Sequence, residues 1–111
     1  MHRFEDTGKV EDITQAIEHL ENAVSLITPG IDTVGATSSA LGDLYARRFK
    51  CTINVQDINC AISHHQKSVQ SIPSGHTDLP GRLNNLGNSY LCRFECTGDL
   101  KDVDSAIIPP P

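Results

Sequence analysis

Apolar residues recur at intervals of three and four along most of this chain, the spacing of one face of an α-helix. The first clear case covers residues 11–27, where Ile13, Ile17, Leu20 and Val24 follow this spacing. The same pattern predicts four further helices, over residues 34–49, 55–72, 79–96 and 100–108. No segment alternates apolar and polar residues with period two over a useful length, so the sequence predicts an all-α fold.

Helix-breaking residues lie between the expected helices. Thr28-Pro29-Gly30 is expected to end the first helix, and Pro73-Ser74-Gly75 the third. Asp78 is expected to cap the start of the fourth helix, where Pro80 is tolerated in the first turn.

The chain contains an internal repeat with a period of 45 residues. Arg3-Phe4 recurs as Arg48-Phe49 and again as Arg93-Phe94, each 45 residues later (48 − 3 and 93 − 48), and Asp12 recurs as Asp57 and Asp102. Residues 3–47 align with 48–92 without a gap and share 15 identical positions in 45. Composition alone would give roughly three. Two helix types therefore alternate: a first type over 34–49 and 79–96, and a second type over 11–27, 55–72 and 100–108.

One turn position differs between the copies of the repeat. Short turns are expected at Gly8 and Gly98, because glycine readily adopts a left-handed conformation. The middle copy has Ile53 at this place. We therefore expect the neighbouring Asn54 to take the left-handed conformation instead.

The repeat resembles the tetratricopeptide repeat, whose first helix carries W-x2-L-G-x2-Y and whose second helix carries A-x3-F followed by Ala and Pro. Leu83, Leu86, Gly87 and Tyr90 match the first-helix motif, with Leu83 in the Trp place. The remaining signature positions are Leu41, Gly42 and Tyr45 on the other first-type helix, with Ser38 in its Trp place, and Ala16, Ala61 and Ala106 on the second-type helices.

Two runs are similar to the long-period, tetratricopeptide-like arrays of large fungal proteins, namely RLNNLGNSYL at 82–91 and RFECTGDL at 93–100. Those arrays accompany caspase-like CHAT domains or carry the label "aromatic di-alanine and TPR-containing". The resemblance implies antiparallel helix-turn-helix units stacked as a short right-handed α-solenoid of about two and a half units. Residues 1–108 would form this single domain and residues 109–111 a proline tail. The period of 45 exceeds the family's period of about 34 residues.

Composition and charge exclude several classes of protein. The chain is 38% hydrophobic and 21% charged, a balance typical of folded proteins, and its net charge is −5 with Arg47-Arg48 as the only basic pair. Nucleic acid is therefore not an expected partner. No run approaches the ~20 apolar residues of a membrane span, and residues 1–10 lack the apolar core of a signal peptide. We expect no membrane partner and a cytoplasmic location, with the nucleus as the alternative.

Histidines and cysteines raise the question of a metal site. In the cytoplasm, Cys51, Cys60, Cys92 and Cys96 are expected to be reduced thiols. The candidate ligands are His64, His65, His76, Cys92 and Cys96, but no second ligand pair has zinc spacing. His65 stands in the Phe place of the motif, which favours a partly buried structural role. No phosphate-binding loop and no Cys/His catalytic segment is present, so we expect no metal, no cofactor and no enzymatic activity.

The resemblance also implies a ligand surface, because first helices line the concave face of tetratricopeptide arrays. The positions that commonly face it are Asn84 and Asn88 in one unit and Ser39 and Asp43 in the other, with Arg47 and Cys92 one turn later and Leu91 as an apolar contact. Asn amides can hold the backbone of an extended peptide, although ordinary polar surface explains Asn84 and Asn88 equally well. Family members that clamp the carboxylate tail of chaperones use Lys together with Asn. The matching positions here hold no Lys and Asp43 would repel a carboxylate, so that ligand is not expected.

Three readings of the function remain open from the sequence. The first is a protein-interaction or scaffolding module that binds a peptide or protein segment in the groove between first-type helices. The alternative is a structural spacer, or a truncated part of a longer repeat protein, that self-associates through uncovered apolar end faces and has no independent ligand. A non-catalytic piece of a CHAT-type, peptidase-related protein is a third reading.

Overall fold

Five α-helices form the regular structure of the chain. The computed structural model describes residues 7–26, 31–72 and 75–107. The helices are α1 (Thr7–Leu26), α2 (Ile31–Thr52), α3 (Val55–Gln70), α4 (Leu79–Thr97) and α5 (Leu100–Ile107). Those three ranges contain no strand, so the all-α prediction is confirmed for them.

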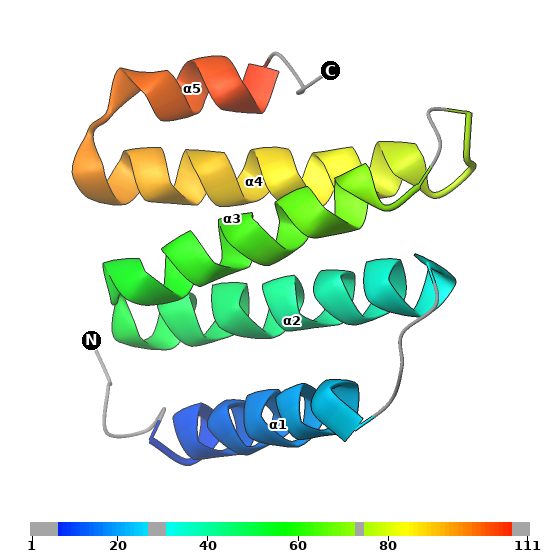
Figure 1. Cartoon of the computed structure of the whole chain (residues 1–111). Coiled ribbons are helices and arrows are strands. Elements are labelled where there is room, and N and C mark those ends of the chain that lie inside the picture. Colours follow the sequence, from blue (N-terminus) through cyan, green and yellow to red (C-terminus); the bar gives the residue numbers. More distant parts are fainter. Residues whose placement is uncertain (1–6, 27–30, 73–74, 108–111) are drawn as a thin grey trace.

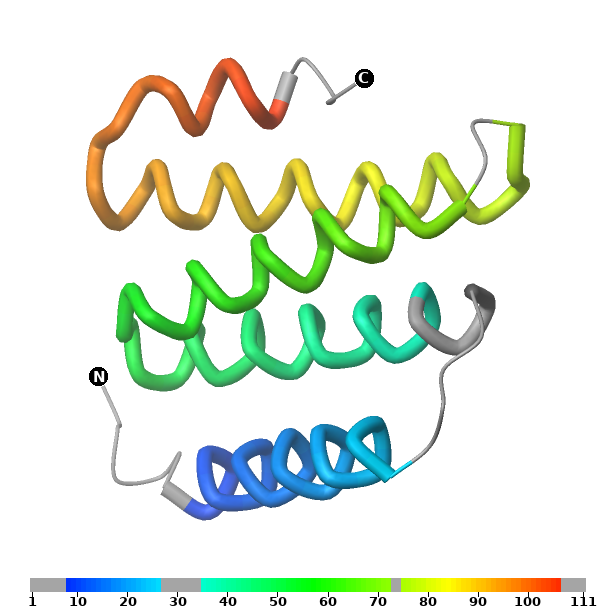
Figure 2. The backbone as a smooth tube through the Cα atoms, viewed as in Figure 1, coloured from blue at the N-terminus to red at the C-terminus, as the bar shows by residue number. Residues whose placement is uncertain are grey.

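The helices lie side by side in the order of the chain (Figure 1). Each helix packs against its neighbours in sequence, and α2 also contacts α4. Figure 2 shows the backbone running back and forth, so that α2 and α4 point the same way with α3 reversed between them. The molecule is a flat slab of 43 × 38 × 19 Å.

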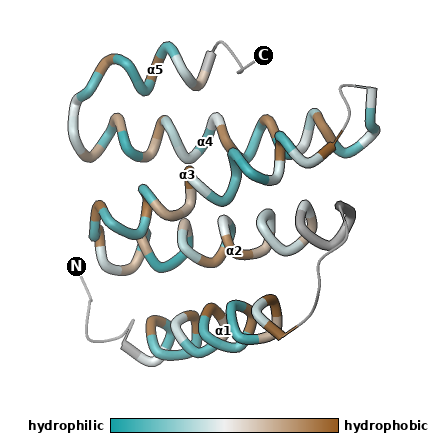
Figure 3. The backbone as a smooth tube through the Cα atoms, viewed as in Figure 1, coloured by the Kyte–Doolittle hydropathy of each residue, from teal (hydrophilic) through white to brown (hydrophobic). Residues whose placement is uncertain are grey.

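The core is centred on α3, which is covered on two sides. Figure 3 shows hydrophobic and hydrophilic positions alternating along the helices, as expected where each helix buries one face. The buried apolar residues are Ile17, Leu41, Tyr45, Phe49, Ile58, Ala61, Ile62, Val69, Leu86 and Tyr90. Leu83 and Ala106 pack against this core while remaining partly exposed, and Ala16 is also partly exposed.

Helix ends differ from the sequence prediction by a few residues. The helix α1 begins at Thr7 rather than at residue 11, so Gly8 lies in its first turn and the predicted turn at Gly8 is wrong. One glycine costs a helix about 1 kcal/mol, which the burial of Ile17 and the packing of Ile13 on the following turns outweigh. The helix α2 extends past 34–49 at both ends, and α3 stops at Gln70.

The fourth helix starts where the sequence indicated. Asp78 is its N-cap residue and Pro80 lies in the first turn, but the Asp78 side chain makes no capping hydrogen bond. Residues 27–30, 73–74 and the proline tail at 109–111 lie outside the described residues.

The left-handed turn residue is Ile53, not Asn54. Ile53 has φ 55° and its repeat counterpart Gly98 has φ 76°. Asn54 has an extended backbone, φ −88° and ψ 116°, and its side-chain oxygen accepts a hydrogen bond from the Gln56 amide. An N-cap residue requires that extended backbone, so the left-handed position falls one residue earlier. The prediction for Asn54 is therefore wrong.

Small signature residues lie where helices approach closely. A Cβ atom on Gly42 of α2 would lie 2.6–2.8 Å from the imidazole ring of His65 on α3. Its counterpart Gly87 on α4 would place a Cβ atom 3.3 Å from the carbonyl oxygen of Ala106 on α5. The lack of a side chain at both positions allows a first-type helix to lie against the next second-type helix.

Candidate functional site

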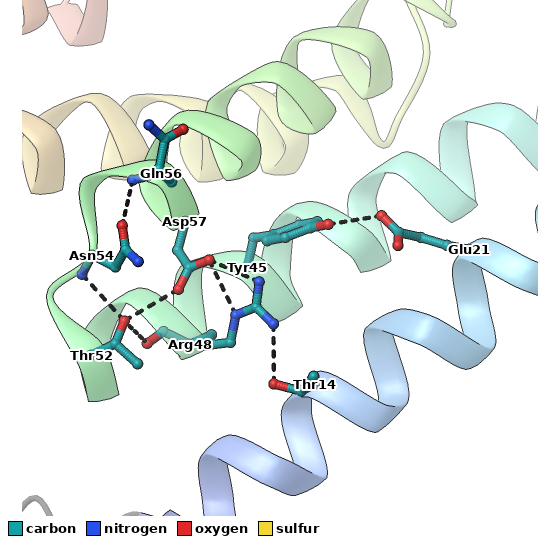
Figure 4. Close-up of polar contacts among 8 residues, drawn as sticks. All are labelled: Thr14, Glu21, Tyr45, Arg48, Thr52, Asn54, Gln56 and Asp57. Carbon is teal, nitrogen blue, oxygen red and sulfur yellow. Dashed lines mark hydrogen bonds and ion pairs between the residues drawn. The ribbon is translucent and has the colours of Figure 1, made fainter.

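A cluster of polar side chains joins α1, α2 and α3 at one end of the slab (Figure 4). The Arg48 guanidinium on α2 donates two hydrogen bonds to Asp57 Oδ1 on α3, at 3.1 and 2.9 Å. Its remaining nitrogen donates to Thr14 Oγ1 on α1 at 3.0 Å. Thr52 Oγ1 donates to the other Asp57 oxygen at 3.2 Å. One arginine therefore connects three consecutive helices.

The same cluster recurs 45 residues later, between α3, α4 and α5. Arg93 donates to both oxygens of Asp102 at 3.0 and 2.8 Å, and to Asn59 Oδ1 at 2.9 Å. Arg93, Asp102 and Asn59 are the counterparts of Arg48, Asp57 and Thr14 (48 + 45, 57 + 45 and 14 + 45). The repeat therefore extends from the sequence to the pattern of side-chain contacts.

The two tyrosines of the repeat, Tyr45 and Tyr90, also form equivalent hydrogen bonds. Tyr45 donates to Glu21 Oε2 on α1 at 2.7 Å, and Tyr90 accepts from Gln66 Nε2 on α3 at 2.6 Å. Burial, followed by the hydrogen bond to Glu21, raises the pKa of Tyr45 to about 12. The hydrogen bond to Asp57 raises the pKa of Arg48, and that to Asp102 the pKa of Arg93. These groups are mutually paired, which fits a structural role.

A groove runs between the parallel helices α2 and α4, and it consists of two adjoining hollows. The hollow toward their N-terminal ends has a volume of about 650 Å³ and is lined by Ala36, Ser39, Ala40, Asp43, Thr77, Asp78, Gly81, Arg82, Asn84 and Asn85. The hollow toward their C-terminal ends has a volume of about 320 Å³ and is lined by Asp43, Ala46, Arg47, Lys50, His65, Asn85, Asn88, Ser89 and Cys92. Asp43 and Asn85 line both.

Six of the seven residues predicted to line a groove come together here. They are Ser39, Asp43 and Arg47 on α2, and Asn84, Asn88 and Cys92 on α4. Leu91 lines neither hollow and is 41% exposed. The reason is helical geometry, since Leu91 lies about 100° around α4 from Cys92. The placement of Leu91 in the groove is therefore corrected.

Sequence reasoning missed several lining residues. Asn85 follows Asn84 directly and stands three positions before Asn88, and Lys50 stands three positions after Arg47. Helical spacing of three and four from the predicted positions would have found both. His65 reaches the groove from α3, and only the packing of three helices reveals that contribution.

His65 is a buried member of the groove wall. It is 2% exposed, and its Nε2 lies 3.6 Å from Asp43 Oδ1. Its Nδ1 has no hydrogen-bond partner among the residues that the structure describes. Burial lowers the pKa of His65, which keeps the ring neutral near pH 7.

The surroundings of Cys92 favour its thiol over its thiolate form. Burial raises the pKa of its thiol, against the opposing effect of nearby Lys50. The thiol form therefore dominates near neutral pH, whereas nucleophilic cysteines act as thiolates.

Across the described residues, no group of three His, Cys, Asp or Glu side chains could hold a metal ion. None of the helices in the described part of the chain is long and apolar enough to cross a membrane.

Comparison with known protein families, with curated proteins and with solved structures finds no match for this chain.

Proposed function

We propose that this protein is a tetratricopeptide-like interaction module that binds an extended peptide or protein segment in the groove between α2 and α4. The observation that carries the proposal is the pair of adjoining hollows along parallel first-type helices. Their combined length suits a segment of chain better than a compact small molecule, because the hollows follow one another along the helices. The module acts by binding, without chemistry of its own.

The α-solenoid arrangement belongs to this proposal. It is supported by the stacking of helices in chain order and by the recurrence of the Arg48 and Arg93 clusters at the same offset. It is also supported by the contact between α2 and α4, since first helices of successive units are neighbours in tetratricopeptide arrays. About two and a half units would then be present.

Amide side chains provide the recognition chemistry. Asn84, Asn85 and Asn88 line the groove from α4, and their side chains make no hydrogen bond to any residue in the described ranges. Each amide offers two N–H donors and one carbonyl acceptor. A row of such groups can pair with the alternating N–H and C=O groups of an extended backbone.

The direct test uses peptides selected from a random display library on the wild-type protein. We expect Asn84→Ala combined with Asn88→Ala to weaken the selected peptides by tenfold or more, since two paired backbone hydrogen bonds of about 1 kcal/mol each are lost. Isothermal titration calorimetry measures the affinity. Asn22→Ala is the matched control, because Asn22 is exposed on α1 away from the groove. Unchanged affinity in the double variant would remove the groove from the proposal.

Self-association is the second candidate function. Its supporting observation is exposed apolar surface at the two ends of the stack, where Leu26 of α1 is 84% exposed and Leu100 of α5 is 70% exposed. Sedimentation velocity over a hundredfold range of concentration tests it. A rising sedimentation coefficient that Leu100→Ser abolishes would favour this candidate, and a constant monomer would count against it.

A further inference from the structure

The two hollows of the groove differ in charge. The hollow at the N-terminal ends contains the carboxylates of Asp43 and Asp78 together with Arg82. The hollow at the C-terminal ends contains the cations Arg47 and Lys50, with Asp43 at its border. The groove therefore changes from acidic to basic along its length.

Among the residues that the structure describes, few cations neutralise the carboxylates of the first hollow. The Asp43 side chain is 53% exposed, and among the described residues its one ion-pair neighbour is the buried ring of His65 at 3.6 Å, which is neutral near pH 7. Asp78 is approached only to 4.0 Å by Arg82 and to 3.9 Å by His76. Arg82 Nη1 instead donates to the Ser68 carbonyl at 3.0 Å and to Ser71 Oγ at 3.3 Å. Arg82 is therefore held mainly by the end of α3.

The positive charge of the second hollow is also available to a ligand. Within the described ranges, neither Arg47 nor Lys50 forms an ion pair, and both side chains are exposed. Burial raises the pKa of the Cys92 thiol. Lys50 lowers this pKa from across the groove, and Glu95 raises it. The cations Arg47 and Lys50 therefore outnumber Asp43, the one carboxylate that lines the second hollow.

We propose that the groove recognises a segment with segregated charges, whose basic side chain lies over Asp43 and Asp78 and whose acidic side chain lies over Arg47 and Lys50. This inference rests on the proposed function and specifies its ligand. Asp43 and Lys50 are seven residues apart in sequence, which corresponds to about 10 Å along the helix. An extended chain covers that distance in about three residues. The two charged residues of the ligand therefore stand about three positions apart in its sequence.

The test compares peptides of identical composition. Fluorescence anisotropy is measured with labelled nine-residue peptides that carry two Lys, two Glu and five Ser or Asn. In two block peptides the Lys pair and the Glu pair are separated by two neutral residues, in either order, so that the nearest Lys and Glu stand three positions apart. In the control peptide, Lys and Glu alternate. All three have the same net charge, so only the arrangement of charge differs.

We expect one block peptide to bind about tenfold more tightly than the alternating peptide at low salt, and the advantage to shrink as salt is added. The charge-swapped variant, Asp43→Lys with Lys50→Glu, should prefer the opposite block order. Circular dichroism confirms that this variant folds, and both substituted positions are exposed. Asn88→Trp, which fills the second hollow, should abolish the binding of every peptide.

The outcomes separate the inference from the proposed function. Equal binding of block and alternating peptides that is still lost in Asn88→Trp overturns the charge inference and supports the groove. An unchanged block preference in the charge-swapped variant also overturns the inference. If neither block peptide binds at about 1 mM, the inference fails, while the groove itself is judged by the display selection with Asn84→Ala and Asn88→Ala.

Discussion

At the scale of single residues, Arg48 and Arg93 each link a first-type helix to the helices on both sides of it. Each guanidinium directs its hydrogen bonds to an aspartate nine residues later and to a polar side chain 34 residues earlier. The aspartates are buried while the arginines are only partly so. Removing the charge of the buried aspartate leaves the arginine without its main partner. The resulting loss of stability is larger than that from breaking an exposed ion pair.

Asp57→Asn is expected to lower the free energy of unfolding by about 1–3 kcal/mol, because the amide removes the charge that holds Arg48. Urea denaturation followed by circular dichroism measures the change. Glu21→Gln is the control, since the counterpart of Glu21 is Gln66, which already bonds to Tyr90. That substitution should change stability by less than about 0.5 kcal/mol. Equal effects of the two variants would show that the Arg48 cluster does not stabilise the stack.

Two histidines of α3, the partly buried His64 and the buried His65, make stability depend on pH. Burial lowers the pKa of His64 and of His65 below 6.5 in the folded state. The unfolded chain therefore binds protons more readily, and the stability from these neutral rings is present above pH 6.5 and is lost as pH falls below it. We expect the melting temperature to fall between pH 7 and pH 5. The double variant His64→Gln, His65→Gln should show a smaller fall.

A control for that experiment is Ser68→Ala, a substitution without a titrating group. Ser68 is fully buried one helical turn after His64 and His65, and its hydroxyl has no hydrogen-bond partner among the described residues. Its removal should leave the pH dependence unchanged. If the histidine variant shows the same pH dependence as the wild-type protein, the carboxylates control acid stability instead.

At the scale of helices and turns, the two equivalent turns use different residues for the same backbone shape. Ile53 and Gly98 both have positive φ, and both amides donate to the carbonyl of the phenylalanine four residues earlier, Phe49 or Phe94. A left-handed conformation costs a β-branched residue about 1–2 kcal/mol. The turn after α2 therefore holds strain that the turn after α4 lacks.

Ile53→Gly should raise the free energy of unfolding by about 0.5–1 kcal/mol, because relief of the strain exceeds the entropy cost of glycine. Ile53 is 49% exposed, so little packing is lost. The reciprocal change Gly98→Ala should lower stability by about 1 kcal/mol, since no atom crowds a Cβ there and only the φ angle opposes it. Thermal denaturation of both variants provides the measurement. A loss of stability in Ile53→Gly would contradict this account.

The sequence predicted all five helices, because each buries a face whose apolar residues recur at helical spacing. Asn84, Asn88 and Cys92 lie at intervals of four, so the sequence could group them on one face of a helix, and all three line the hollows between α2 and α4. The sequence prediction failed at Ile53, where the need of Asn54 for an extended capping backbone overrode residue preference. It also missed the pairing of Arg48 with Asp57, which requires the geometry of the turn between α2 and α3.

At the scale of the whole molecule, most contacts join helices that are neighbours in sequence. Among the described residues, α1 packs against α2 alone and α5 against α4 alone. The central helix α3 has seven buried residues, from Asp57 to Val69. Stability is therefore expected to decrease from the middle of the molecule toward the end helices, because each end helix has one packing neighbour.

Hydrogen exchange followed by mass spectrometry tests this gradient. We expect amides of α3 to be the slowest to exchange and those of α1 and α5 to be the fastest, because an end helix can detach while breaking one interface. Peptides from residues 58–69 report on α3 and peptides from residues 10–24 report on α1. Uniform protection across all five helices would mean that the chain unfolds as one cooperative unit.

The fixed offsets of the polar clusters bear on how such a chain can change in length. Each arginine reaches nine residues forward and 34 residues back, and each tyrosine reaches 24 residues back. A tandem duplication of any stretch of 45 residues would reproduce all of these offsets at once, whereas an insertion of another length within a unit would break them. The side-chain contacts between the helices are therefore preserved when the chain gains or loses whole periods of 45 residues.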